Sequence, residues 1–109
     1  MIEWNDFEKI DIRTGTIIAA TTFEKAKKPA YKLKIDFGAE GIKNSSAQIT
    51  VLYSLNELIG KQVVAVINFP PKQIADFMSE CLVLGVYNEN NDVVLLMPDK
   101  QTENGKKIG

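Results

Sequence analysis

Apolar and polar residues alternate over short stretches of this chain, a pattern typical of strands that bury one face. The alternation is clearest from Tyr31 to Phe37, where lysine or aspartate stands between apolar and aromatic residues. The other stretches of strand-like composition are Thr14–Phe23, Asn44–Val51, Gln62–Phe69, Cys81–Tyr87 and Val93–Met97. Six short strands predict a β-rich fold.

Glycine, proline and asparagine separate these stretches and predict where the strands bend or end. Gly15 indicates a bend or bulge inside the first strand. Gly38 and Gly41 bracket a turn. Pro70 and the proline after it end the fourth strand, because neither can donate to a ladder. The polar run Asn88–Asp92 predicts a hairpin loop between the last two strands.

A short helix is predicted at the start of the chain, because Trp4, Phe7 and Ile10 recur at helical spacing on one face. Asn5 or Asp6 is the expected cap. A helix this short is marginal alone, so its apolar face needs a docking surface. That surface is either the body of the domain or a second subunit.

A second short helix, Leu55–Ile59, is predicted by the capping-box spacing of Ser54 and Glu57 and ends at Gly60. The expected order is therefore a short helix, three strands, a helix and three strands. A helix between the third and fourth strands of a small barrel is the plan of an OB-fold. The expected fold class is all-β, one OB-fold domain over residues 1–109, and a small β-sandwich is the alternative.

The charge balance argues against a generally basic nucleic-acid-binding domain. The chain has 13 basic and 14 acidic residues and a net charge of −1. The lysines are nevertheless clustered, at Lys25, Lys27, Lys28, Lys32 and Lys34 and again at Lys100, Lys106 and Lys107. Such a cluster is either an ordinary solvated face or a local positive patch.

The composition lacks the usual materials of catalysis. There is no histidine, and no phosphate-binding glycine loop, Cys-x-x-Cys pair or G-x-S-x-G elbow occurs. We therefore expect a binding protein with no catalytic residues, metal site or cofactor. The one cysteine, Cys81, stands in an apolar run and is interpreted as a buried structural thiol.

The first residues are acidic and do not resemble a signal peptide, and no apolar stretch approaches the ~20 residues of a membrane helix. A reducing cytoplasmic location without membrane insertion is the resulting expectation.

Two sets of motifs, spread over the chain, carry a family resemblance. The first set is Asp11–Gly15 (DIRTG), Leu58–Val64 (LIGKQVV) with Asn68, and the pair Ser79-Glu80. These motifs resemble the tRNA-binding OB domains, which also occur appended to some aminoacyl-tRNA synthetases. The second set is Ile35–Gly38 (IDFG), Lys43–Thr50 (KNSSAQIT), Val66–Pro71 (VINFPP) and Gly105–Gly109 (GKKIG). Within that superfamily, this set resembles the bacterial export-related chaperones.

The resemblance implies a cytoplasmic OB-fold homodimer that binds unfolded or precursor polypeptides. It further implies delivery of these polypeptides to the export machinery and its translocation ATPase, with no cofactor and no ATP hydrolysis. The expected peptide-binding residues are Asn68, Phe69, Phe77 and Met78. Exposed aromatic and methionine side chains suit promiscuous binding, whereas strand termination at Pro70 and core packing of Phe77 are the structural alternatives.

The alternative function is tRNA binding on the same barrel. Its expected contacts are Lys27, Lys28, Lys32, Lys72 and Ser79. The polar face that carries Lys32 and Lys34, with Ser46 and Gln48 beside it, is the expected binding surface by analogy with other OB-folds. Cys81 and Leu82 depart from the Gly-Met pair of the tRNA-binding relatives, which weighs against tRNA.

Arg13, the only arginine, is expected to make a bidentate bond inside the fold, with Asp11 or Glu80 as its partner. Its alternative is the recognition of a carboxylate or phosphate on a ligand.

Overall fold

The computed structural model describes residues 1–109 and consists mainly of strands. The strands are β1 (Ile12–Thr22), β2 (Tyr31–Asp36), β3 (Ile42–Ala47), β4 (Gln62–Val66), β5 (Lys72–Ile74), β6 (Phe77–Ser79), β7 (Leu82–Val83), β8 (Gly85–Tyr87) and β9 (Val93–Leu95). The helical segments are α1 (Trp4–Glu8), α2 (Leu55–Leu58) and the 3-10 turn η1 (Gly38–Glu40).

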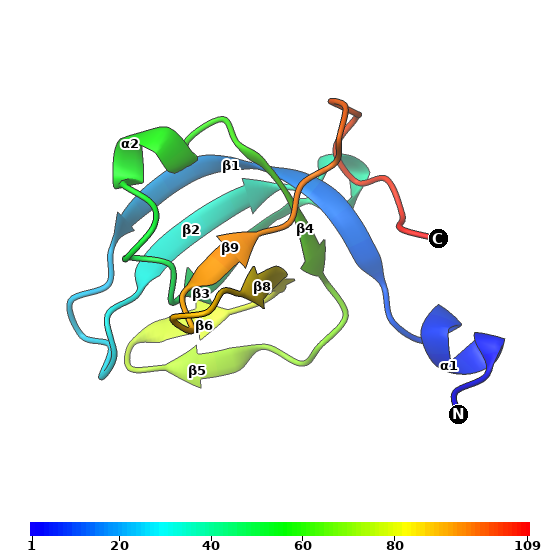
Figure 1. Cartoon of the computed structure of the whole chain (residues 1–109), viewed down its shortest axis with the longest axis horizontal. Helices are drawn as coiled ribbons and strands as arrows, with labels where there is room; N and C mark the ends of the chain where they lie inside the picture. The colour runs from blue at the N-terminus through cyan, green and yellow to red at the C-terminus, as the bar shows by residue number, and fades with distance from the viewer.

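Five strands form a nearly closed barrel in the order β3-β2-β1-β4-β7, with every neighbouring pair antiparallel (Figure 1). The remaining gap lies between β3 and the chain leading into β7. There the amide of Glu80 donates to the carbonyl of Asn44 at 2.8 Å, and the Ser45 hydroxyl donates to the carbonyl of Cys81 at 3.0 Å. This architecture, with α2 between β3 and β4, confirms the predicted OB-fold.

The core lies inside the barrel and follows the predicted alternation. Leu33, Ile35 and Phe37 are buried along β2, and α2 adds Leu58, which is also fully buried. The capping box forms as predicted. The Glu57 amide donates to the Ser54 hydroxyl at 3.4 Å, and the Ser54 amide donates to the Glu57 carboxylate at 3.1 Å. Helix α2 thus fixes one end of the barrel.

The bulge predicted at Gly15 lies instead at Ile18. The register of β1 against β2 shifts between Ile17 and Ala19, while Gly15 pairs regularly with Val63 of β4. Gly15 is needed for space, because a Cβ atom there would stand 2.7 Å from the Phe37 ring. Close packing of the Ile35 and Phe37 side chains against the backbone, not backbone curvature, therefore explains this glycine.

Several predicted strands are shorter than expected, because each ends where its partner ends. The third strand was predicted as Asn44–Val51, but β3 ends at Ala47, which pairs with Tyr31 at the start of β2. The fifth was predicted as Cys81–Tyr87, but it breaks at Leu84 into β7 and β8. At Leu84 the chain changes neighbours, since its amide donates to Val64 and its carbonyl accepts from Leu96.

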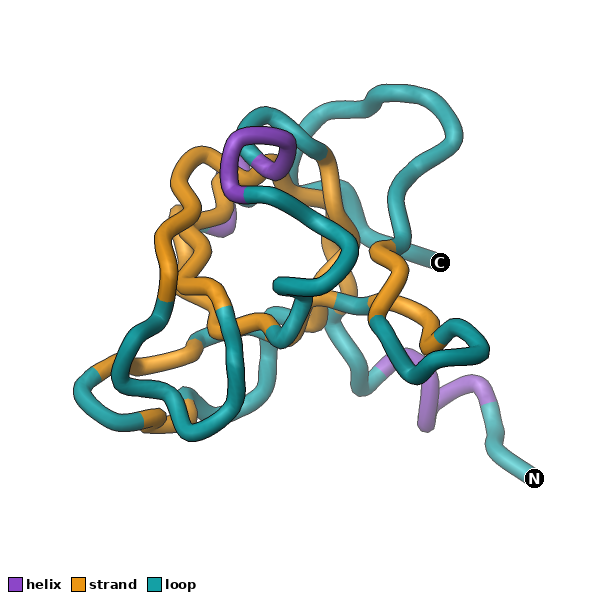
Figure 2. Tube along the Cα trace, turned by 60° about the vertical axis from the view of Figure 1, so that its left-hand side comes forward, coloured by secondary structure: helices purple, strands orange, loops and turns teal.

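The segment after the two prolines forms a hairpin that the sequence pattern did not predict. Strands β5 and β6 pair in a sheet of their own, and Ala75 at their turn has a positive φ of 52°. We call this hairpin, residues 72–79, the β5–β6 hairpin. Figures 1 and 2 show it projecting from the barrel, at the opposite end of the molecule from α1.

Helix α1 has Glu3 at its cap position, so the predicted caps Asn5 and Asp6 are wrong. The Asp6 carboxylate lies inside the first turn and accepts from the Glu3 amide at 2.8 Å. No residue of α1 is buried, and Trp4 is 77% exposed. Of the two docking surfaces expected for this helix, the barrel therefore does not cover its apolar face. No helix here has the length and apolar character to cross a membrane.

Candidate functional site

A groove lined by lysines lies between the loop that joins β1 to β2 (residues 23–30) and the β5–β6 hairpin. Its volume is about 590 Å³. We call it the lysine groove; its polar lining is Lys25, Lys27, Lys28, Ser46, Gln48, Lys72 and Gln73. The loops after the first and fourth strands flank the binding face of OB-folds, so the groove occupies that position.

Aromatic packing holds the 23–30 loop against the hairpin. The buried ring of Phe23 meets the ring of Phe77 edge to face at 5.4 Å between centroids. The Lys32 ammonium lies 4.9 Å from the Phe23 centroid and 5.3 Å from that of Phe77. Lys32 is therefore placed by cation–π contacts beside the two rings. Lys25 adds an ion pair to Asp76 at 2.9 Å.

The structure brings Lys27, Lys28 and Lys72, three of the five residues expected for nucleic acid, into one groove. Lys32 lies at the base of the same loop, against the aromatic pair. The Ser79 hydroxyl accepts from the Ser46 amide at 3.1 Å and so joins the hairpin to β3.

A second recess, of about 330 Å³, lies at the base of the hairpin. We call it the Phe69 pocket; its lining is Phe69, Pro70, Lys72, Ser79, Glu80, Cys81 and Leu82. Phe69 and Leu82 are exposed large apolar residues, at 56% and 49%. Lys72 lines both recesses, so the Phe69 pocket and the lysine groove are adjacent.

The expected peptide-binding residues do not gather at one point. Phe69 lines its pocket, whereas Phe77 packs on Phe23, as the structural alternative proposed. Met78 pairs with Gln73, is 44% exposed, and lies on the face of the hairpin opposite Phe77.

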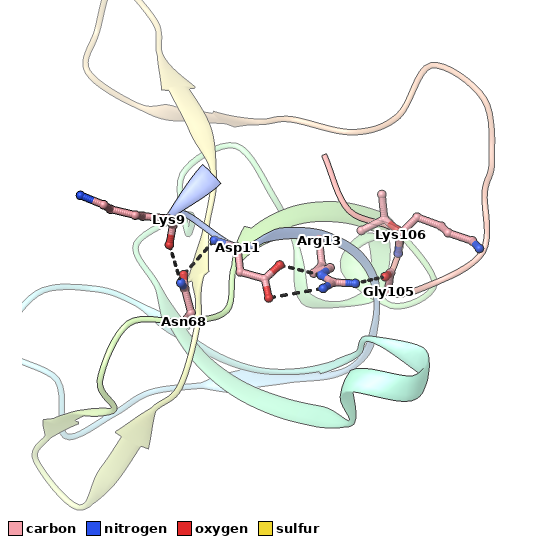
Figure 3. A network of polar contacts seen from close by, with 7 residues as sticks. Lys9, Asp11, Arg13, Asn68, Gly105 and Lys106 are labelled. Atoms are coloured by element: carbon pink, nitrogen blue, oxygen red, sulfur yellow. Dashed lines mark hydrogen bonds and ion pairs between the residues drawn. The ribbon is translucent and has the colours of Figure 1, made fainter. Parts of the chain in front are cut away.

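Asn68 connects the barrel to the segment that leads into β1. Its amide oxygen accepts from the Asp11 amide at 2.9 Å, and its nitrogen donates to the Lys9 carbonyl at 2.7 Å (Figure 3). The Asn68 side chain thus positions the chain between α1 and β1.

Arg13 makes the predicted bond inside the fold, and its partner is Asp11. Its Nε lies 2.6 Å from Asp11 Oδ1, and Nη1 donates to the Gly105 carbonyl at 3.0 Å (Figure 3). The hydrogen bond to Asp11 raises the pKa of Arg13. Arg13 therefore joins the C-terminal segment to β1, whereas Glu80, the other expected partner, accepts from the Asn44 amide.

Cys81 is buried, as expected, and burial raises the pKa of its thiol from 9.0 to about 11.

At pH 8 this shift leaves about 100-fold less thiolate than in an exposed cysteine. A thiol reagent should therefore label Cys81 in the folded protein at least about 100-fold more slowly than in the protein unfolded in urea. The raised pKa also means that Cys81 stabilises the fold below pH 9, and that this contribution is lost as the pH rises to 11. Equal labelling rates in the two states would contradict this assignment.

No group of three or more His, Cys, Asp or Glu side chains is arranged to hold a metal ion. The two recesses present ammonium, amide, hydroxyl, carboxylate and apolar groups, which suit the binding of a polymer by contacts along its length.

Sequence reasoning missed Asp76 and the inclusion of Lys25 in the groove. Both depend on the β5–β6 hairpin, which brings residues 51 positions apart into contact. The aspartate at 76, a residue type common in turns, was the available signal.

Comparison with known proteins agrees with this geometry. The family model described as "Putative tRNA binding domain" matches residues 12–107. The chaperone CsaA of Bacillus anthracis str. Ames is 52% identical with a TM-score of 0.94, and the CsaA chaperone protein of Picrophilus torridus is 58% identical with a TM-score of 0.94. Both structures cover 100% of this chain, which in turn covers 99% and 100% of theirs.

The methionine–tRNA ligase of Methanococcoides burtonii is 35% identical over 108 residues, which are 99% of this chain but 16% of that ligase. The chain therefore spans only a small part of such ligases, and the similarity concerns that part alone. Since the family model covers nearly all of the barrel, and full-length relatives share more than half of its residues, this chain belongs to the tRNA-binding domain family and is similar, within it, to the CsaA chaperones.

Proposed function

We propose that the protein is a chaperone that binds unfolded or precursor polypeptides, without ATP, and assists their export. The observation that carries this proposal is the adjacency of the two recesses through Lys72. An extended polypeptide presents apolar side chains and polar backbone groups in alternation. The Phe69 pocket suits the former, while the ammonium and amide groups of the lysine groove suit carbonyls and acidic side chains.

The apolar rim supports broad specificity. Phe69, Leu82 and Met78 are exposed, and an exposed methionine adapts its shape to irregular partners. Asn68 and Phe77 contribute indirectly in this proposal, since Asn68 holds the α1–β1 segment and Phe77 holds the 23–30 loop. The names of the two CsaA chaperones support the same function. We place it in the cytoplasm, with the translocation ATPase as an expected partner.

We further propose that the protein is a homodimer, because the apolar face of α1 has no cover in one chain. Ile2, Trp4 and Phe7 line a cavity of about 600 Å³ with the C-terminal residue Gly109. A second copy of the chain that packed against this face would bury these apolar side chains, which a single chain leaves uncovered.

Replacing Trp4 and Phe7 together with serine is expected to weaken self-association at least tenfold, because each aromatic ring contributes about 1.5–3 kcal/mol when it is buried. Light scattering across a dilution series gives the measurement. Ile42→Ser removes a large apolar residue outside α1 that is 59% exposed, and should leave the mass unchanged. A monomeric parent protein, or a double variant that associates as tightly as its parent, would rule out this interface.

The second candidate function is tRNA binding, which the lysine groove favours. Lys25, Lys27, Lys28 and Lys72 line one surface at the binding position of the OB-fold, and the matching family supports the same ligand. Electrostatic binding of this kind is independent of sequence and falls steeply with added salt.

Two titrations of the purified protein at physiological salt separate the candidates. One uses a reduced and alkylated unfolded polypeptide, and the other uses bulk tRNA. Saturable polypeptide binding that suppresses aggregation, with little tRNA binding, is the result expected for the chaperone. Saturable tRNA binding without polypeptide binding would assign the protein to tRNA handling instead.

A further inference from the structure

One acidic side chain at the turn of the β5–β6 hairpin pairs with a lysine of the lysine groove. Asp76 Oδ2 lies 2.9 Å from Lys25 Nζ, and the two side chains are 53% and 68% exposed. Lys25 is one of the four lysines that line the groove. The Asp76 carboxylate is therefore already paired with an ammonium group that a ligand would meet on entering the lysine groove.

Two nearby lysines, Lys25 and Lys32, favour the ionised form of Asp76. Its hydrogen bond to Lys25 lowers the pKa of the carboxyl, and the charge of Lys32 lowers it further. Asp76 is thus ionised at neutral pH and offsets part of the positive potential between the loop and the hairpin. A phosphate that binds Lys25 has to displace this carboxylate first, and it then lies close to a like charge.

We propose that Asp76 is a specificity-determining residue that holds Lys25 and so lowers the affinity of the lysine groove for the phosphate backbone of nucleic acids relative to polypeptides. The proposal rests on the proposed function in one respect, namely that the lysine groove is the ligand site. A polypeptide is less affected, because its backbone carries no charge that Asp76 repels.

A role for Asp76 as a mechanical tie between loop and hairpin is the competing explanation. The Phe23–Phe77 contact and the Lys32 ammonium over both rings already join these two segments. The ion pair is exposed to water on both sides, and such pairs contribute little to stability. The two explanations differ in the sign that they predict for the loss of Asp76. Release of the Lys25 ammonium should tighten tRNA binding, whereas loss of a tie should loosen the groove and weaken it.

The test titrates bulk tRNA and an alkylated unfolded polypeptide into the parent protein and into Asp76→Asn, Lys25→Ala and the double variant. Glu40→Gln is the charge-matched control, since Glu40 is exposed and lies on η1, beyond the end of β2 that is away from the 23–30 loop. Asp76→Asn should tighten tRNA binding about fivefold near 0.15 M salt and steepen the slope of log affinity against log salt by about 0.7–0.9, the share of one additional phosphate contact.

Lys25→Ala should weaken tRNA binding, and adding Asp76→Asn to it should restore little, because the freed ammonium is then absent. Polypeptide binding should change less than twofold in Asp76→Asn. Asp76→Ser should behave like Asp76→Asn, which separates the loss of charge from any effect of asparagine on the turn.

Three results would overturn the proposal. Unchanged tRNA affinity in Asp76→Asn, with polypeptide binding intact, would reject the role of Asp76 and leave the proposed function standing. A weaker tRNA complex in Asp76→Asn would favour the mechanical tie. If no variant bound either polymer, the proposed function would fail together with this inference.

Discussion

Replacing Phe37 with alanine is expected to lower the free energy of unfolding by about 3–5 kcal/mol, the largest effect of any single substitution considered. The Phe37 ring is fully buried and belongs to the main core cluster. It lies over Gly15, which has no side chain to move into the vacated space. The cavity would therefore persist, and persistent cavities give the highest costs.

Urea unfolding measures this effect as a lower midpoint with an unchanged m value. Phe69→Ala is the matched control, because it removes the same ring from a site that is 56% exposed. The control should unfold within about 0.5 kcal/mol of the parent protein, yet bind the unfolded polypeptide more weakly. Equal losses of stability in Phe37→Ala and Phe69→Ala would contradict the assignment of one ring to the core and the other to a ligand pocket.

The alternation from Tyr31 to Phe37 predicted the core of the barrel correctly, because a half-buried strand imposes a period of two on its residues. The capping box at Ser54 was equally readable, since its two bonds join residues three positions apart. Features that depend on local chemistry were thus accessible from the sequence.

Features that depend on partners distant in the sequence could not be predicted from it. A glycine that makes a bulge and a glycine that makes room for Phe37 look the same in a sequence, so Gly15 was misinterpreted. The end of β3 is set by β2, and the break at Leu84 is set by the change from β4 to β9 as neighbour. Neither partner can be read from the strand itself.

The candidate site shows the same division. Lys27, Lys28 and Lys72 were expected by residue type and by resemblance, and the fold places all three in one groove. Their grouping depends on the β5–β6 hairpin, which three-residue strands signal weakly. Asp76 was missed for this reason, since its contact with Lys25 spans 51 positions.

Replacing Lys27, Lys28 and Lys72 together with alanine is expected to weaken tRNA binding on the order of 100-fold near 0.15 M salt. Each lysine that neutralises a phosphate adds about 0.7–0.9 to the salt slope, so three lost contacts should reduce the slope by about 2–3. The three side chains are exposed or at the groove wall, so the fold should remain intact. Titrations at four or more salt concentrations give both the affinity and the slope.

The matched control replaces Lys100, Lys106 and Lys107 with alanine, which removes the same charge from the C-terminal segment. A uniform attraction between the whole protein and tRNA would weaken equally in both triple variants, because the net charge changes equally. If the lysine groove holds the phosphates, the first triple variant should bind tRNA far more weakly than the second. Polypeptide binding adds a further distinction, since the apolar contacts in the Phe69 pocket do not depend on charge. It should weaken less than tRNA binding in the first variant and persist in the second. If the first variant kept the affinity and slope of the parent protein for tRNA, the lysine groove would not be a phosphate-binding surface, and polypeptides would be left as its ligands.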